Sequence, residues 1–408
     1  MKILVLNAGS SSHKLCLYAW GDAFLPKSAP APVWQAQIDW YSDRVTVEVS
    51  PKAASPGAPL KENKDFTSRR QILSEVLSTL WQGTNPVLHR PDEIDAVGHR
   101  VVHGGQTYQT STLVTPDVKT EISRLRSLAP NHNPANLEGI ELMEELLGDT
   151  PQIAVFDTAF HRQMPDVAAI YPGPYEWVNQ GIRRYGFHGI SHQYCSQRAA
   201  QLLKRDDLRL IICHLGNGGS LTAVHHGQSI DTTMGFTPLD GLMMGTRSGA
   251  IDPGILIYLM RQGYSADQLD QVLNKESGLK GISGISHDLR HIKEAITAGD
   301  VRAQLALDIY LHRLKSCVGS MLMGLGGLDV IVFTAGIGEH AASIRTETCK
   351  AMAFLGLKLD LVKNEQNPVD QDVAMTDSAV RVLVIHTQED WAIAQDCWSC
   401  IQQMRDSA

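Results

Sequence analysis

Glycine-rich turns that follow apolar segments are the first residues of this sequence that could do chemistry. Three such segments occur: NAGSSS from Asn7, HLGNGGS from His214 and TAGIGEH from Thr334. Glycine permits positive φ, so backbone N–H groups can approach an anion closely. One such turn alone indicates no more than a hairpin, but the carboxyl ends of strands are where α/β sheets bind ligands. None matches G-x-x-x-x-G-K-[ST] or G-x-G-x-x-G, so neither a P-loop nor a dinucleotide fold is predicted.

Two arginines stand where a positive charge needs an explanation. Arg100 lies in the otherwise apolar GHRVVHGG, where a charge is costly unless it is paired or functional. Arg247 lies among small residues in MGTRSGAIDP, where a guanidinium group could grip phosphate or carboxylate through two hydrogen bonds. A core carboxylate for Arg100 and plain solvation for Arg247 remain the structural alternatives.

Three further side chains are candidates for chemistry. Asp157 ends the run QIAVF, which is a common catalytic position and also a common helix N-cap position. His188 lies beside Phe187 in YGFHGISH, and a single histidine of this kind is normally structural. Glu389, in HTQED, could bind a hard cation such as Mg²⁺ or could cap the last helix.

Length and composition set the broad class. The chain has 408 residues, 43% hydrophobic and 20% charged, so we expect a folded protein with two domains. The net charge of −8 gives no general attraction for nucleic acid or for an anionic membrane. No apolar run approaches the roughly 20 residues that span a bilayer, and the opening run is too short for a signal peptide. We therefore expect a cytoplasmic protein.

The seven cysteines are expected to be reduced thiols, and Cys397 and Cys400 form their one close pair. A redox or zinc role needs a second pair or a histidine at ligand spacing, which the sequence lacks. Simple packing on a late amphipathic helix is therefore the favoured interpretation.

The hydrophobic pattern places the candidate residues on strands and helices. The predicted strands are 3–6, 14–18, 33–38, 44–49, 94–102, 152–160, 208–220, 329–340 and 380–390, with a hairpin over 221–233. The predicted helices are 67–81 with Thr67 as N-cap, 116–128, 133–147, 252–262, 265–274, 287–298, 300–323 and 341–354, and a last helix with Trp391 and Trp398. The Pro- and Ala-rich stretches KSAPAPV and AASPGAPL predict surface loops.

Two segments repeat one order of elements. ILVLNAGSSSHKLCLY and LIICHLGNGGSLTAVH each read as strand, Gly/Ser/Asn turn and strand. Two halves that open in this way indicate a duplicated α/β unit, although the arrangement is common enough to arise by coincidence.

Taken together, these segments resemble the acetate kinase (acetokinase) family, within the superfamily of sugar kinases, heat-shock chaperones and actin. LVLNAGSSSHK resembles the family's N-terminal motif, and RRYGFHGISH its second motif. The segments that follow the family's order are GHRVVHGG, LAPNHNP, FDTAFH, CHLGNGGS, MGFTPLDGLMMGTRSG, HDLR and TAGIGEH. The resemblance implies an α/β fold of two duplicated actin-like (ribonuclease H-like) domains with a cleft between them.

The resemblance also implies a reaction and its site. The γ-phosphate of ATP would pass reversibly to acetate, giving acetyl phosphate and ADP, with Mg²⁺ (or Mn²⁺ in its place) held by Asn7 and Glu389. The implied catalytic residues are Asp157, Arg100, Arg247, His188 and His132. The implied substrate-binding residues are Arg100, Val102, Phe187 and Pro238. The residues implied to bind nucleotide or phosphate are Ser10, Ser12, Lys14, His214, Leu215, Gly216, Asn217, Gly218, Asp288, Leu289, Arg290, Gly336, Ile337, Gly338, Glu339 and His340.

The family pattern further divides these roles between domains. Residues 1–157 with 391–408 would form the N-terminal domain, on the substrate and metal side, and 158–390 the C-terminal domain, on the nucleotide side. The implied partners are ATP or ADP and a short carboxylate or its acyl phosphate, without nucleic acid or membrane, and a second copy in a homodimer. Acetate is already ionised at neutral pH, so its oxygen needs no general base. We therefore expect Asp157, the family's acid/base residue, to orient Arg100 or the metal.

Three residues depart from the family pattern: Asn131 for a Leu beside the substrate pocket, His340 for an Asn near the nucleotide, and His13 for an apolar residue. An unpaired amide against a methyl pocket costs roughly 1–3 kcal/mol, so Asn131 either turns away or meets a more polar substrate. Val102 favours a two-carbon acid. A kinase for propionate, butyrate or a hydroxy acid therefore stays open, as does a non-catalytic nucleotide-binding regulator, which would not need the metal and acid-binding residues.

Overall fold

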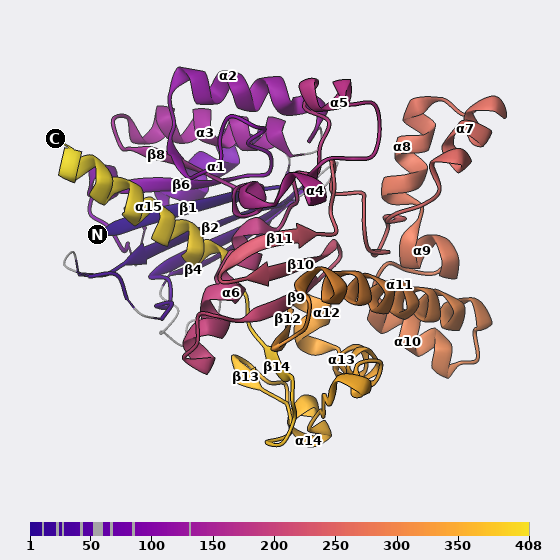
Figure 1. Ribbon diagram of the computed structural model, residues 1–408. Coiled ribbons are helices and arrows are strands. Elements are labelled where there is room, and N and C mark those ends of the chain that lie inside the picture. Colours follow the sequence, from indigo (N-terminus) through magenta and orange to yellow (C-terminus); the bar gives the residue numbers. More distant parts are fainter. Residues whose placement is uncertain are drawn as a thin grey trace. The chain divides into compact units, whose positions relative to one another are not determined.

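The computed structural model describes residues 1–9, 12–21, 24–26, 28–40, 44–51, 60–65, 68–83, 86–129 and 132–407. Contacts divide the chain into two compact units, Met1–Ala159 with Gln388–Ala408, and Phe160–Thr387 (Figure 1). Ser10, Thr67 and Asn131, each named in the sequence analysis, lie outside the described residues. The assignment of substrate and nucleotide sides to the two units stays a prediction.

The first unit is built on a mixed sheet. Its strands are β1 (Lys2–Ala8), β2 (Ser12–Ala19), β3 (Trp34–Trp40), β4 (Arg44–Pro51), β5 (Leu60–Asp65), β6 (Ala96–Val101), β7 (Thr112–Leu113) and β8 (Gln152–Phe156). Their order across the sheet is β5-β4-β3-β2-β1-β6-β8-β7. The hairpins from β1 to β5 are antiparallel, whereas β6 runs parallel to both β1 and β8.

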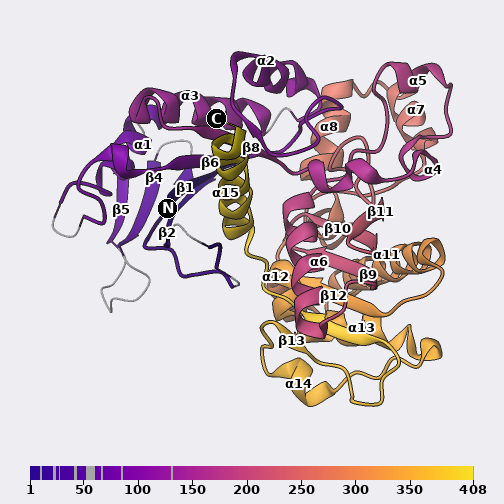
Figure 2. The same ribbon diagram turned by 60° about the vertical axis from the view of Figure 1, so that its left-hand side comes forward.

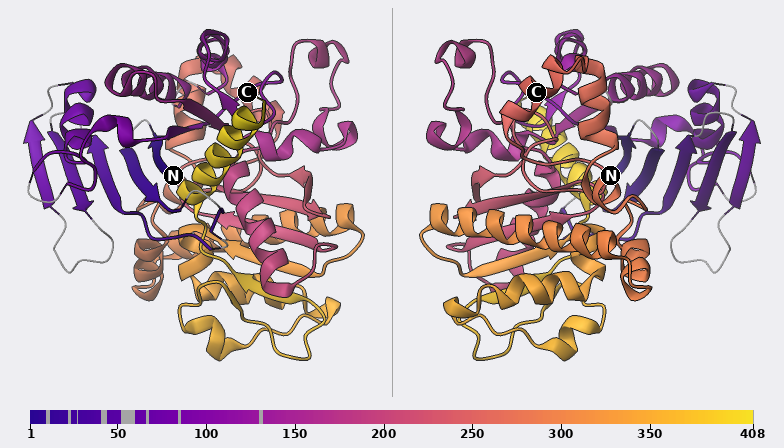
Figure 3. Two further views of the ribbon diagram at one scale, coloured as in Figure 1. Left: turned by 90° about the vertical axis from the view of Figure 1, so that its left-hand side faces the viewer. Right: turned by 90° about the vertical axis from the view of Figure 1, so that its right-hand side faces the viewer.

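Helices cover both faces of this sheet. On one face, α1 (Arg69–Ser78) and α3 (Asn133–Leu147) share a core with Leu4 and Leu6 of β1, and α2 (Pro116–Arg124) packs beside α3. On the other face lies α15 (Glu389–Ser407), the yellow helix of Figure 3, which packs on β1 and β6. A Cβ on Gly98 of β6 would come within 2.6 Å of Cys397 Sγ, so glycine lets α15 approach the sheet.

The second unit repeats this plan with a smaller sheet. Its strands are β9 (Arg209–Leu215), β10 (Gly219–His225), β11 (Gln228–Thr232), β12 (Val330–Thr334), β13 (Gln371–Asp372) and β14 (Arg381–Val384), in the order β11-β10-β9-β12-β14-β13. The long helix α11 (Val301–Leu325) covers one face and α6 (Gly189–Leu203) the other (Figure 2). The other helices are α4 (Asp166–Ala169), α5 (Glu176–Asn179), α7 (Pro253–Arg261), α8 (Ala266–Lys275), α9 (Gly278–Ser283), α10 (Leu289–Thr297), α12 (Ala335–His340), α13 (Ala342–Lys350) and α14 (Leu361–Glu365).

Both sheets share one core topology. β3-β2-β1-β6-β8 in the first unit and β11-β10-β9-β12-β14 in the second have the same order and the same directions. In chain order these are the third, second, first, fourth and fifth core strands of each unit. The mixed α/β class and the duplication expected from the sequence are therefore confirmed.

Some predicted elements have other bounds in the structure, and some observed elements were not predicted. Helix α1 begins at Arg69, and its N-cap is Ser68, whose Oγ accepts from Gln71 N at 3.1 Å. The predicted strand over 329–340 is wrong beyond Thr334, because Ala335–His340 form α12, whose first residue, Ala335, has a positive φ of 64°. Strand β5 and helix α6 were not predicted from the hydrophobic pattern.

Two general expectations concern thiols and membranes. All seven cysteines are free, and Cys397 is fully buried where α15 packs on β6, as the packing interpretation predicted. No helix in the described part of the chain is both long and apolar enough to cross a bilayer.

Candidate functional site

Arg100 is the centre of a charged cluster in the first unit. Its Nη2 forms an ion pair with Asp157 Oδ2, and its Nη1 donates to Asn7 Oδ1 at 3.3 Å. The three residues come together because β1, β6 and β8 are parallel neighbours and each residue lies near a carboxyl end. Burial opposes the Arg100 charge, but Asp157 and then Glu389 outweigh it, so the pKa of Arg100 is raised. Asp157 is only 2% exposed, and it fixes the direction of the guanidinium group.

The first turn of α15 adds carboxylates to this cluster. Glu389 is its first residue, and no hydrogen bond reaches the Glu389 carboxylate from the described residues. Burial, and then the charge of Glu389, raise the pKa of the neighbouring Asp390, whose Oδ2 lies 3.6 Å from Cys16 Sγ. Lys14 lies opposite Asn7 in the β1–β2 register and is exposed.

The residues present fit a divalent metal with few protein ligands. Glu389 offers a carboxylate and Asn7 an amide oxygen. Both lie near Arg100, since Asn7 Oδ1 accepts a hydrogen bond from it and the charge of Glu389 raises its pKa. Among the described residues no group of three or more His, Cys, Asp or Glu side chains is placed to hold a metal. Mg²⁺ typically takes one or two protein oxygens and completes its shell with water and phosphate, so two ligands suffice.

Two asparagines that the sequence analysis did not single out position the segment after β6. Asn136 Oδ1 accepts from Val102 N at 3.1 Å, and Asn136 Nδ2 donates to Ala8 O at 2.6 Å. Asn133 makes hydrogen bonds to both the N–H and the C=O of His103, each at 3.3 Å. The start of α3 therefore ties the end of β1 to the buried Val102. Half-buried His132 immediately precedes this helix.

His188 belongs to a buried histidine–serine network in the second unit. It precedes α6 in a left-handed conformation (φ 56°), and its Nδ1 lies 3.0 Å from Ser220 Oγ. The same Ser220 Oγ lies 2.7 Å from His192 Nε2. The His188 ring stacks on that of His214 at 4.1 Å between centroids, and His214 Nδ1 bonds Ser191 Oγ at 2.8 Å. Ser220 and Ser191 therefore hold the two rings in place.

Burial keeps the deeper histidines of this network neutral. It lowers the pKa of His192 well below its usual value, an effect that His161 and His214 strengthen. Burial likewise lowers the pKa of His161 to about 4. The His161 ring lies 2.9 Å from Ser229 Oγ and 3.1 Å from the backbone oxygen of Phe187, a buried residue.

Arg247 approaches the β9–β10 turn. A Cβ on Gly218 would lie 3.5 Å from Arg247 Nη1 and 3.6 Å from His188 Nε2, so the turn, the arginine and the histidine converge. Arg247 Nη1 donates to Pro238 O at 3.3 Å, and burial lowers the pKa of Arg247. No carboxylate forms an ion pair with Arg247 among the described residues.

The loop that carries Pro238 is itself held by named contacts. Tyr171 Oη accepts from Phe236 N at 2.9 Å, and Arg184 Nη1 donates to Asp240 at 3.2 Å and to two backbone oxygens. Val102 belongs to the first unit and Phe187 and Pro238 to the second. The expected methyl pocket stays a prediction.

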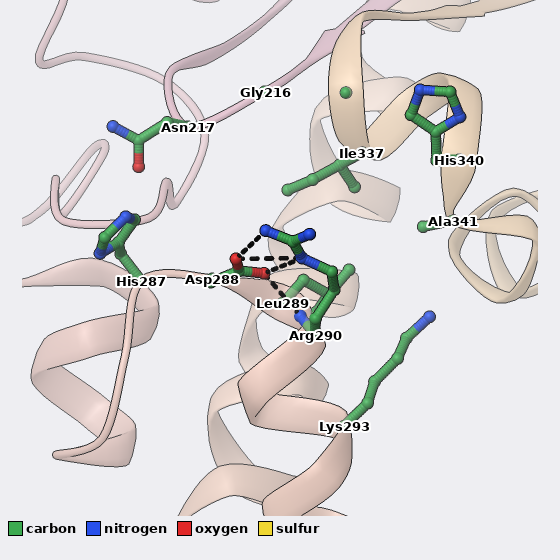
Figure 4. Close-up of a pocket in the computed structure, with 11 residues that line it drawn as sticks. Gly216, Asn217, His287, Asp288, Leu289, Arg290, Lys293, Ile337, His340 and Ala341 are labelled. Carbon is green, nitrogen blue, oxygen red and sulfur yellow. Dashed lines mark hydrogen bonds and ion pairs between the residues drawn. The ribbon is translucent and has the colours of Figure 1, made fainter. Parts of the chain in front are cut away.

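A cavity of about 600 Å³ lies beside the β9–β10 turn of the second unit (Figure 4). The expected nucleotide residues that line it are Gly216, Asn217, Asp288, Leu289, Arg290, Gly336, Ile337 and His340. His287, Lys293 and Ala341 line it too and were not among the expected site residues. His287 and Ala341 adjoin the expected Asp288 and His340 in the sequence, and Lys293 lies one turn after Arg290 on α10. Its size is that of a small-molecule site.

Other residues expected at the nucleotide lie outside this lining. Leu215 belongs to the hydrophobic core, and Gly338 packs against the backbone of Phe333. Glu339 is buried, and its Oε1 accepts from Ala335 N at 2.9 Å while its Oε2 lies 2.6 Å from His386 Nδ1. Glu339 thus stabilises α12, which carries the glycine segment.

Comparisons with known proteins show the family of this chain. A sequence model of the acetokinase family matches residues 2–395. The chain is 66% identical over 398 residues to an acetate kinase of Acaryochloris marina, covering 98% of this chain and 99% of that protein. It is 62% identical to an acetate kinase of Trichormus variabilis, covering 99% and 100%.

Two solved structures share the fold of this chain. The crystal structure of Porphyromonas gingivalis acetate kinase matches with a TM-score of 0.88 and 39% identity, covering 98% of this chain and 99% of that one. A propionate kinase from Francisella tularensis matches with a TM-score of 0.87 and 39% identity, covering 97% and 98%. The fold is therefore that of these kinases, with actin-like units. The chain belongs to the acetokinase family.

Proposed function

We propose that the γ-phosphoryl group of ATP passes in one reversible, in-line step to an oxygen of acetate. The acetate oxygen forms its bond to the γ-phosphorus as the bond to the bridging oxygen breaks, and the electron pair leaves with ADP. The chain is an enzyme that phosphorylates acetate from ATP, as its family and its identity to curated acetate kinases show. The direct route and the residue roles below are the proposal.

The convergence of Arg247 and His188 on Gly218 carries the proposal. An unpaired guanidinium group and an imidazole N–H, both fixed by protein contacts, can stabilise charge on a phosphoryl group in transit. Ser220 fixes the His188 ring by its bond to Nδ1, which turns Nε2 toward the turn. The phosphates of the nucleotide would lie along Gly216–Gly218, where the two glycines let a phosphate approach the backbone closely.

In the first unit, Arg100 would bind the acetate carboxylate. The ion pair with Asp157 occupies one edge of the Arg100 guanidinium group and fixes the direction in which its other edge points. Acetate is ionised at neutral pH and has no proton for a base to remove. Asp157 would therefore act by positioning Arg100. Asn7 and Glu389 would hold Mg²⁺, with Mn²⁺ able to replace it. When bound, the metal neutralises phosphate charge and shields the acetate from repulsion.

Acetate is the favoured acid, because the relatives at 66% and 62% identity are acetate kinases whereas the propionate kinase is 39% identical. The regulator is not favoured either. Val102 and Phe187 are each buried and apolar, as a side chain beside a methyl group must be. A regulator would have no use for the buried Arg100–Asp157 pair. A cytoplasmic location, where ATP is made and used, is part of the proposal.

Acyl phosphate formation tests this function. ATP and MgCl₂ are supplied with acetate, propionate, butyrate or glycolate, and hydroxylamine traps the product. Turnover with acetate above the other acids is expected, and omission of the metal should abolish it. Preference for another acid would refute acetate as the substrate, and absence of product with every acid would refute the kinase activity.

A homodimer is also proposed, through the apolar helix α7. Its nine residues, PGILIYLMR, include no buried side chain, and Ile257, Tyr258 and Met260 are each more than half exposed. A helix that is apolar yet uncovered marks a contact surface. Sedimentation should show two copies for the native chain and one for Ile257→Lys with Tyr258→Lys, and a monomeric native chain would refute it.

A further inference from the structure

A threonine determines where the hydroxyl proton of Ser191 points. Thr387 Oγ1 donates to Ser191 Oγ at 2.9 Å, and His214 Nδ1 lies 2.8 Å from the same oxygen. Ser191 is fully buried on α6, and its hydroxyl group has one proton to donate. Because Ser191 already accepts from Thr387, its own proton goes to Nδ1 of His214. The proton of a neutral His214 ring is therefore on Nε2.

Ser220 belongs to a second chain of the same form. Its Oγ lies 3.0 Å from His188 Nδ1 and 2.7 Å from His192 Nε2, and it can donate to only one of these rings. Burial lowers the pKa of His192 well below its usual value, so this ring is neutral and has a single N–H group. Its Nδ1 is buried and has no hydrogen-bond partner among the described residues.

Two arguments decide the direction of this second chain. A proton on Nδ1 of His192 would be a buried donor without an acceptor, which proteins avoid more strictly than an unpaired acceptor. His192 therefore donates from Nε2 to Ser220, and Ser220 donates to Nδ1 of His188. A Cβ on Gly218 would lie 3.6 Å from His188 Nε2, so this nitrogen faces the turn that the phosphates would approach. A phosphoryl oxygen only accepts hydrogen bonds, so it too selects a proton on Nε2.

We propose that two residues outside the reacting groups, His192 and Thr387, each act through a serine to place the proton of a phosphate-side histidine on Nε2. His192 does so for His188, and Thr387 does so for His214. Both are positioning residues. This inference rests on the proposed function, in which these rings donate to the phosphates, and it means that both rings are donors before the nucleotide binds.

Nitrogen NMR measures the position of these protons directly. In native protein with ¹⁵N-labelled histidine at about pH 8, where histidine is ordinarily neutral, long-range ¹H–¹⁵N correlations distinguish a protonated from an unprotonated ring nitrogen. His188→Gln and His214→Gln identify the two rings by the loss of their signals, and both rings should carry the proton on Nε2. His161 is the internal reference, because its Nε2 lies 3.1 Å from Phe187 O, which can only accept. A proton on Nδ1 of either ring would overturn the proposal.

Removal of the threonine hydroxyl tests the first chain. In Thr387→Val the ratio of the Nε2–H to the Nδ1–H form of His214 should fall about fivefold, the effect of one lost hydrogen bond. The kcat should fall by no more than about fivefold, since turnover follows the population of the Nε2–H form. Thr387→Ser, which retains the donor, should keep the native ratio. Thr348→Val, which removes a buried hydroxyl group from α13, is the matched control.

Replacement of His192 tests the second chain in the same way. His192→Leu should lower the corresponding ratio for His188, and His192→Gln, whose amide group donates, should restore it. Thr387→Val remains decisive if the buried leucine prevents folding. An unchanged ratio in Thr387→Val would overturn the proposal, and a lower kcat with an unchanged ratio would show that Thr387 acts only through stability. If both protons are on Nε2 but the native chain forms no acyl phosphate, the proposed function fails and the proton placement stands.

Discussion

Each unit has an ion pair near the carboxyl ends of its fourth and fifth core strands, but the two pairs have opposite polarity. In the first unit the cation, Arg100, lies on the fourth core strand and the anion, Asp157, follows the fifth. In the second unit the anion, Glu339, follows the fourth core strand and the cation, His386, follows the fifth. Both anions are buried, but the cation Arg100 is 18% exposed, whereas the cation His386 is 52% exposed. The first pair is buried in the proposed site, and the second supports α12.

The two arginines of the proposed site also differ in their pairing. Arg100 has a counter-ion, and its pKa is raised; Arg247 has none among the described residues, and burial lowers its pKa. The paired guanidinium group is fixed in direction, while the unpaired one keeps its full charge for a ligand. A duplicated fold thus acquires two functions through the side chains at its strand ends.

Removal of the unpaired arginine should have the largest effect. Arg247→Ala is expected to lower kcat by 10²-fold or more, because a preorganised charge aimed at the transition state is lost. The acyl-hydroxamate assay at saturating ATP and acetate measures this loss. Arg205→Ala, which removes an exposed arginine paired with Asp207, should leave kcat unchanged. A loss in Arg247→Ala that appears only as a higher KM would place this arginine in ground-state binding.

Loss of the buried carboxylate should come next. Asp157→Asn is expected to reduce kcat/KM for acetate on the order of 10²-fold, because Arg100 loses its orientation and its compensating charge. A double-mutant cycle with Arg100→Ala checks the mechanism. If Asp157 acts through Arg100, the double variant should be no slower than Arg100→Ala alone. Additive losses would show that Asp157 has a role of its own in proton transfer.

The histidine network of the second unit should be more tolerant. Ser220→Ala removes the partner that His188 and His192 share, and kcat is expected to fall about tenfold, the effect of one lost hydrogen bond. KM for acetate should change little. Ser229→Ala removes an equally buried partner of His161 and serves as control. Equal losses of activity in both variants, with equally lowered melting temperatures, would mean that Ser220 acts only through stability.

Side chains at strand ends could be predicted because their local sequence is distinctive. The glycine turns, Asn7, Arg100 and Asp157 each follow a short apolar run, and the structure brings Asn7, Arg100 and Asp157 into contact. The strand pairs that position them follow from the same runs. Motifs of this kind place chemistry on an α/β fold without knowledge of its packing.

Elements with polar buried faces or no apolar face could not be predicted in this way. Helix α6 buries Ser191, His192 and Ser196, so its inner face reads as polar in the sequence. Strand β5, LKENKD, pairs with β4 at the sheet edge, where charged residues are common and hydrophobic alternation is absent. Lys293 lies three residues after the expected Arg290, so the spacing of the predicted helix over 287–298 could have indicated it.

The smallest predicted effect concerns the half-exposed pair of the second unit. Its hydrogen bond to Glu339 raises the pKa of His386 above 6.5, so the stabilisation is fully present below about pH 6.5 and is lost as pH rises through the raised value. The pKa of Glu339 is lowered below 4.5, so the same contact also fails in acid, as pH falls through that lowered value. His386→Gln, which keeps a donor but cannot titrate, should lower the melting temperature by less than about 3 °C at pH near 6 and by less still at pH near 9. Thermal denaturation of the native protein and of His386→Gln at the two pH values measures this difference. His312→Gln, which replaces an exposed histidine on α11, is the control. A deficit of the same size at both pH values would show that the ionised pair contributes nothing, and that the polarity of the second unit's pair matters only for the geometry of α12.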